Sequence, residues 1–92
     1  MDLSRYRELS FWIRSEEREI AFRVIARTAS VKSPITNKRS RKFRAFPHWT
    51  RVTVALDRLI GRRNRVEMLG LEIAPEEIRK AGVLYTDNWM LV

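Results

Sequence analysis

Basic and aromatic residues gather in one stretch of this chain, residues 33–51, which contains no Asp or Glu. The bases are Lys38, Arg39, Arg41, Lys42, Arg44 and Arg51, and the aromatic residues among them are Phe43, Phe46 and Trp49. Lys and Arg bind nucleic acid by releasing the counterions condensed on its phosphates. Aromatic faces stack on unpaired bases, with about 1–3 kcal/mol per base. The stretch therefore predicts a nucleic-acid-binding surface, with Phe43 and Trp49 as the expected base contacts.

The distribution of charge along the chain supports the same prediction. The net charge is +8, and every carboxylate lies outside residues 20–56, where nine Lys and Arg have no acidic neighbour in the sequence. A typical protein surface mixes both signs of charge. We expect the basic track to continue along the next helix and its exit through Arg58, Arg62, Arg63 and Arg65. For the aromatic residues, packing in the core is the competing interpretation.

The inventory of catalytic side chains is small. His48 is the only histidine and cysteine is absent, so one chain cannot assemble a Cys-His pair, a metal site with several histidines or a thiolate metal site. The carboxylates of residues 16–19 are explained by the start of a helix, where they complement the helix dipole. The sequence predicts a protein that is not an enzyme and needs no metal or cofactor.

Length and composition predict one small globular domain spanning residues 1–92. An apolar content of 45% is too high for a disordered tail. No apolar run approaches the roughly 18 residues that a membrane-spanning helix requires, and the N-terminus lacks the pattern of a signal peptide. We expect a cytoplasmic protein that does not contact a membrane, or a nuclear one if the source is a eukaryote.

The first half of the chain predicts mostly helices. Residues 2–13 predict a first helix with Asp2 as its N-cap. Their apolar residues recur at helical spacing: Leu3, Tyr6, Leu9 and Ile13. Residues 20–29 fit a helix, in which Glu19 pairs with Arg23, and also a strand of alternating apolar residues. The helix is the preferred interpretation. Residues 34–46 are interpreted as a basic helix or as a loop that becomes ordered on binding, and Pro47 ends either one.

The second half predicts one further long helix and a small sheet. Residues 50–60 match the helical template through Val52, Ala55, Leu56, Leu59 and Ile60. Residues 65–73 predict a strand with a bulge near Gly70, and a compact helix follows from Pro75 to Gly82. Residues 83–92 predict a short hairpin that turns at residues 86–88. The expected fold class is α+β: a helix-rich small single domain with a short C-terminal antiparallel sheet or hairpin.

Two other functions fit parts of the sequence. Residues 25–34 resemble the first half of a helix-turn-helix motif, with Ala26 at the packed position, Ser30 in the turn and Ser33 as cap of a following basic helix. That resemblance implies a DNA-binding regulator. The apolar C-terminal segment 83–92 instead suits a protein-interaction module or inhibitor, of a virus- or plasmid-borne type, that docks on an acidic surface or pairs with a second copy. The leading prediction is a small non-enzymatic protein that binds RNA or DNA.

Overall fold

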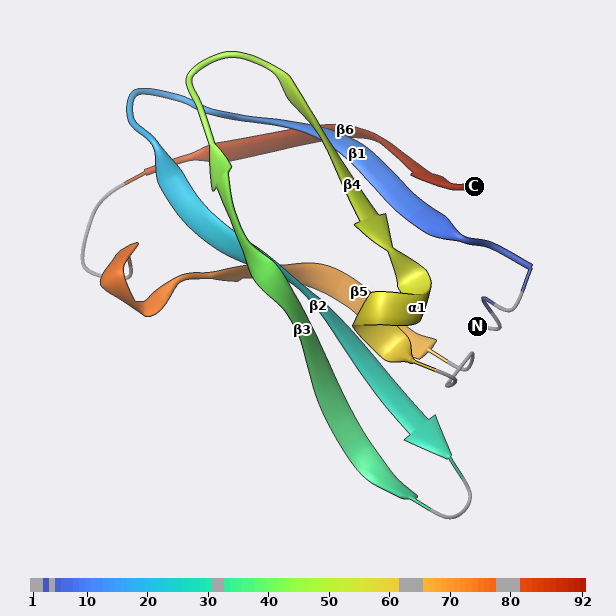
Figure 1. Cartoon of the computed structure of the whole chain (residues 1–92). Coiled ribbons are helices and arrows are strands. Elements are labelled where there is room, and N and C mark those ends of the chain that lie inside the picture. Colours follow the sequence, from blue (N-terminus) through green and yellow to red (C-terminus); the bar gives the residue numbers. More distant parts are fainter. Residues whose placement is uncertain (1–2, 4, 31–32, 62–65, 78–81) are drawn as a thin grey trace.

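The computed structural model describes residues 3, 5–30, 33–61, 66–77 and 82–92, and most of them lie in strands (Figure 1). The elements in chain order are β1 (Glu8–Ser15), β2 (Ile20–Ser30), β3 (Ser33–Ala45), β4 (Thr50–Ala55), α1 (Leu56–Ile60), β5 (Val66–Ile73), the 3₁₀ helix η1 (Pro75–Glu77) and β6 (Leu84–Leu91). The predicted helix-rich α+β fold is therefore wrong, because the described part of the chain is mainly β.

The strands form two antiparallel sheets of three strands each. One sheet has the order β4–β1–β6 and the other has the order β3–β2–β5. A short turn joins β1 to β2, and another joins β3 to β4. Each pair of consecutive strands therefore forms one path that crosses from one sheet to the other, and we call the turn between the sheets the bend (Figure 1). Hydrogen bonds join the paths at the bend, where Ser15 N donates to Phe46 O at 2.8 Å and Glu16 N donates to Val83 O at 3.1 Å.

β1 and β2 replace the first two predicted helices. In β1 the buried residues Leu9, Phe11 and Ile13 are two apart, which is the period of a strand with one face in the core. In β2 the strand alternative is correct and the preferred helix is wrong. Both strands are central and form ladders on two sides. That pairing outweighs a helical i,i+4 ion pair, which contributes only about 0.2–0.5 kcal/mol.

The basic stretch is a strand rather than the predicted helix or loop. In the described part of the chain β3 pairs only with β2, and such an edge strand accommodates Pro34, which has no N–H to donate. The helix-turn-helix resemblance fails for the same reason. Thr28 and Thr36, on either side of its expected turn, are opposite one another in the β2–β3 hairpin.

The predicted helix over residues 50–60 divides into a strand and a single helical turn. Val52 and Val54 are buried in β4, and β-branched residues fill this strand well. Only the second half of the helical pattern becomes a helix, α1, which buries Leu56, Leu59 and Ile60. It ends at Gly61, whose φ of 64° is readily adopted by glycine.

The strand predicted for residues 65–73 is confirmed as β5. Its bulge lies at Glu67 and not near Gly70, because the register changes between the pairs Arg27–Met68 and Thr28–Val66. Of the compact helix predicted up to Gly82, the described residues show the 3₁₀ turn η1, and residues 78–81 lie outside them.

The predicted C-terminal hairpin is also wrong. β6 is one strand that pairs with β1 along its length, and the turn-forming residues make a bulge within it. Asn88 has a φ of 52°, and its N–H donates to Asp87 Oδ1 at 2.8 Å. The bulge lies opposite Phe11, where the register of the β1–β6 ladder changes.

The core lies between the two sheets and is closed by α1 (Figure 1). Phe11 and Phe22 are fully buried, and their ring centroids are 6.4 Å apart across the junction of β1 and β2. The side chains around them come from both sheets and α1: Leu9, Ile13, Val24, Val52, Val54, Leu59, Ile60 and Val66. Each of the two sheets thus has an inner face in the core and an outer face towards solvent.

Candidate nucleic-acid interface

Three of the predicted phosphate contacts form ion pairs within the protein. Arg39 Nε lies 2.8 Å from Glu72 Oε1, and Lys42 Nζ lies 2.6 Å from Glu76 Oε1. Arg44 Nη1 lies 3.4 Å from Glu19 Oε2. The fold brings these carboxylates to the bases: Glu72 lies on β5, Glu76 lies in η1 after it, and Glu19 lies in the turn before β2.

Two of the ion pairs lower the pKa of their carboxyl groups. The hydrogen bond from Arg39 holds the pKa of Glu72 below its usual value, and that of Arg39 is raised in return. The hydrogen bond from Lys42 lowers the pKa of Glu76 in the same way. All of these side chains are solvent-exposed, so the pairs are screened and exchange readily. A phosphate that binds Arg39 or Lys42 competes with a carboxylate.

A β-bulge in β3 divides its bases between two faces. The register with β2 changes between the pairs Arg23–Lys42 and Ile25–Arg39. Ser40 fills the gap, since Val24 N donates to Ser40 Oγ at 2.9 Å. A regular strand would place residues 39, 41 and 43 on one face. The bulge instead puts Arg39 on the outer face and leaves Arg41 on the side of Phe43.

Bases from both faces of β3 border a groove between β3, β4 and α1, together with bases of β4 and α1. Two hollows of about 390 and 460 Å³ adjoin there and share Arg41, Phe43 and Thr53 in their walls. The described residues that line the two hollows include no carboxylate. We call this feature the basic groove and define it by its basic residues: Arg39, Arg41, Lys42, Arg44, Arg51 and Arg58.

Three arginines of the basic groove have no carboxylate partner within salt-bridge distance among the described residues: Arg41, Arg51 and Arg58. All three are exposed, and they come from β3, β4 and α1 respectively. Arg41 lies over the ring of Phe43, with 4.2 Å between the guanidinium carbon and the ring centroid. Arg51 Nη2 donates to Ser10 Oγ at 3.5 Å, which places it at the border of β1.

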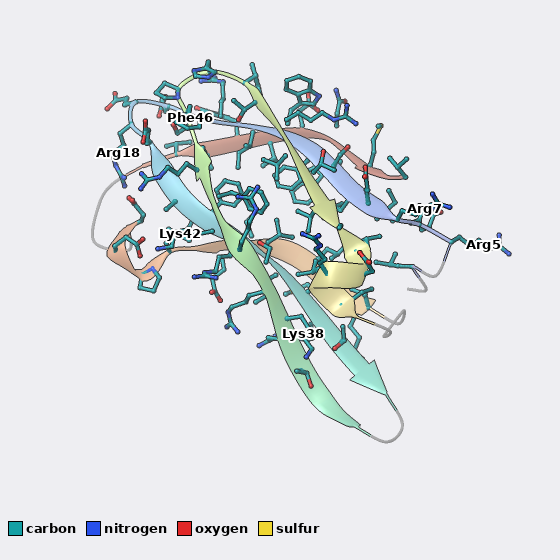
Figure 2. The ribbon with its side chains drawn as sticks, viewed as in Figure 1. Arg5, Arg7, Arg18, Lys38, Lys42 and Phe46 are labelled. Carbon is teal, nitrogen blue, oxygen red and sulfur yellow. The ribbon has the colours of Figure 1, made fainter. Side chains whose placement is uncertain are left out.

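The remaining predicted contacts are placed differently. Lys38 is half-buried opposite Ala26, farther along β3 from the bend than Lys42 (Figure 2). Arg62, Arg63 and Arg65 lie outside the described residues. Phe43 stacks on Phe22 at 5.8 Å and packs against the core, so its ring contributes to folding. Trp49 is 44% exposed, and its ring centroid lies 5.5 Å from the guanidinium carbon of Arg14.

Sequence reasoning missed Trp12, Arg14 and Tyr85, which lie together on the outer face of the β4–β1–β6 sheet. Arg14 stacks over Tyr85 with 4.3 Å between the guanidinium carbon and the ring centroid. The signal was the alternation of β1, in which Trp12 and Arg14 fall between buried residues. Assigning residues 2–13 to a helix hid this alternation, because residues two apart share a face of a strand but not of a helix.

The described residues contain no metal-binding cluster. No cluster of three or more His, Asp or Glu side chains there could hold a metal ion. His48 stacks flat on Phe46, with 5.5 Å between the ring centroids. None of the helices in the described part of the chain reaches the length and apolarity needed to cross a bilayer.

Comparison of this chain with protein-family models, curated proteins and solved structures gives no match.

Proposed function

We propose that this protein binds nucleic acid, RNA or DNA, in the basic groove, with Arg41, Arg51 and Arg58 as the principal phosphate contacts. The observation that carries the proposal is the convergence of three exposed arginines from three elements on hollows lined without a carboxylate. A guanidinium can donate two parallel hydrogen bonds to one phosphate, and it stays charged at every relevant pH.

The bases of the groove differ in whether they already pair with a carboxylate. Arg41, Arg51 and Arg58 gain a counter-charge when a phosphate arrives. Arg39 and Lys42 instead exchange a carboxylate for the phosphate, because each already forms an ion pair within the protein. Three phosphate contacts to a single strand correspond to a slope of about 2 in the plot of log affinity against log salt concentration. The first set should therefore account for most of the salt dependence.

A pair of matched triple variants tests this ranking. Fluorescence anisotropy would measure the affinity of labelled single-stranded DNA, duplex DNA and structured RNA at several salt concentrations. Replacing Arg41, Arg51 and Arg58 by Ala should weaken binding and reduce the salt slope by about 2. The second variant replaces the three ion-paired bases by Ala: Arg39, Lys42 and Arg44. It removes the same charge and should reduce affinity and salt slope by less.

Two results would count against the proposal. The first is a wild-type protein that shows no salt-dependent binding of any of the three nucleic acids. The second is an equal loss of affinity and slope in both triple variants, because net charge alone would then explain binding. Circular dichroism and thermal melting would establish that each variant is folded.

A protein partner or second copy at the C-terminal segment is the alternative proposal. Among the described residues β6 pairs with β1 alone, so none of them pairs with its other edge, which the bulge at Asn88 interrupts. Val83, Trp89, Met90 and Val92 of segment 83–92 are exposed. A pull-down with and without nuclease separates the two proposals, because a protein partner would survive digestion of the nucleic acid.

A further inference from the structure

Aromatic and arginine side chains form a second surface, on the outer face of the β4–β1–β6 sheet. We call it the aromatic face and define it by its members: Trp12, Arg14, Trp49, Arg51 and Tyr85. It faces away from the core, because Phe11 and Ile13, which alternate with its residues on β1, are buried. Three adjacent strand paths contribute to it.

The aromatic face is built in rows across the sheet. In one row Arg14 lies between two rings, with its guanidinium carbon 4.3 Å from the centroid of Tyr85 and 5.5 Å from that of Trp49. In the next row Trp12 is flanked by Arg51 of β4 and Asp87 of β6. Trp12, Trp49 and Tyr85 remain 39%, 44% and 38% exposed. The Arg14 guanidinium packs between Tyr85 and Trp49, and Trp12 lies in the adjacent row.

The chemistry of this face suits unpaired bases. Large exposed aromatic rings gathered on one sheet mark an interaction site. Bases that are not paired stack on such rings, and neighbouring arginines bind the phosphates between them. Bases inside a duplex are stacked on one another and cannot lie on a sheet in this way. The combination of rings and guanidinium groups therefore selects single-stranded over double-stranded nucleic acid.

The aromatic face adjoins the basic groove. Arg51 lines the groove and also flanks Trp12, so the two surfaces meet at β4. The carboxylates near the face lie towards the other edge: Asp87 is on β6, and Glu16 accepts a hydrogen bond from the Tyr85 hydroxyl at 3.4 Å. A polyanionic strand is thereby favoured on the β4 side, next to Arg51.

We propose that the aromatic face binds unpaired bases of a single-stranded nucleic acid whose phosphates lie along the basic groove. Trp12 is the central stacking residue, and Trp49 and Tyr85 extend the surface to either side. This inference rests on the proposed function and adds the class of nucleic acid to it.

Substitution of Trp12 tests the inference. The probes are a fluorescein-labelled oligothymidylate and a labelled DNA duplex of the same length, titrated with the full chain. Trp12→Ala should weaken binding of the oligothymidylate by about 5- to 150-fold, the range that corresponds to loss of one stacked base. Trp12→Phe should restore most of the affinity. Duplex binding should be unchanged, and wild-type tryptophan fluorescence should be quenched by the oligothymidylate.

Two further variants keep the test decisive. Met68→Ala is the matched control, because Met68 is 38% exposed on the outer face of the other sheet and should not affect binding. If Trp12→Ala does not fold, Tyr85→Ala addresses the same face from an edge strand and should weaken oligothymidylate binding selectively.

The possible results separate this inference from the proposed function. Equal affinity for the two probes, with no effect of Trp12→Ala but a loss in the groove triple variant, overturns the inference alone. Absence of salt-dependent binding overturns both. A dimer in light scattering that Trp12→Ala dissociates would make the face an interface between copies and would also overturn the inference.

Discussion

Neutralising three carboxylates should strengthen nucleic-acid binding. Each of them pairs with a base at the basic groove, at distances of 2.8, 2.6 and 3.4 Å. The variant replaces Glu72, Glu76 and Glu19 by Gln, which removes the charge and preserves the shape of the side chain. Arg39, Lys42 and Arg44 are then left without their counter-charges.

The expected magnitude follows from the number of released bases. If all three bind phosphates of a single strand, the slope of log affinity against log salt concentration increases by about 2. Affinity at low salt should rise with it, and this gain should shrink as salt is added. The assay is the anisotropy titration already described, with oligothymidylate as the probe.

A matched control removes the same charge elsewhere. Glu8, Glu17 and Glu67 are exposed carboxylates with no ion pair among the described residues, and their replacement by Gln leaves the groove pairs intact. The control triple should raise affinity only slightly, through net charge. The reasoning is refuted if both triples produce the same change in slope, or if the first triple produces none.

Two further predictions concern stability. Glu72→Gln should lower the free energy of unfolding slightly at neutral pH, and the difference from wild type should vanish in acid. Because Arg39 depresses the folded-state pKa of Glu72, the carboxylate stabilises the fold above its ordinary pKa and loses this effect as pH falls through the depressed value; urea unfolding at a series of pH values checks it, and a difference independent of pH contradicts it. Ser40→Ala should cost about 1–3 kcal/mol, because Val24 N–H loses its acceptor in the bulge. In the same urea assay Asn37→Ala, at an exposed position of β3, should cost no more than about 0.5 kcal/mol.

The error in the first element shows what the sequence alone could determine about the fold. Leu9 and Ile13 are four residues apart, a spacing that suits one face of a helix and equally one face of a strand, since four is even. Phe11 distinguishes the two, because it would point to another side of a helix but shares the buried face of β1. Weighing Phe11 together with Leu9 and Ile13 would have predicted the strand.

The apolar run that forms β5 was assigned correctly. Residues 20–29 were assigned to a helix, although their alternation from Ile20 to Ala26 also fitted the strand that they form. The helical spacing of Leu56, Leu59 and Ile60 survives in α1. Long-range pairing decided the rest, since a central strand gains ladders on both sides that no local pattern reveals.

The basic stretch illustrates the corresponding limit for the site. Its bases have no carboxylate nearby in the sequence, yet Arg39 pairs with Glu72, 33 residues away, and Lys42 with Glu76, 34 residues away. Neighbours across a sheet, not neighbours along the chain, determine the charge of a β surface. Arg41, Arg51 and Arg58 were predicted as phosphate contacts together with the paired bases, and nothing in the sequence distinguished the two groups.

The bend in the strands connects the two proposed surfaces. A flat sheet with this strand order would place β3 and β4 along one straight edge, with their bases spread over its length. Folding the path between Ala45 and Thr50 brings the two strands to face the same hollows, and α1 adds Arg58 at their end. The bend also leaves the outside of β4 and β1 open beside Arg51. A strand held by its phosphates in the groove is therefore within reach of Trp12, and loss of the groove contacts should weaken stacking as well.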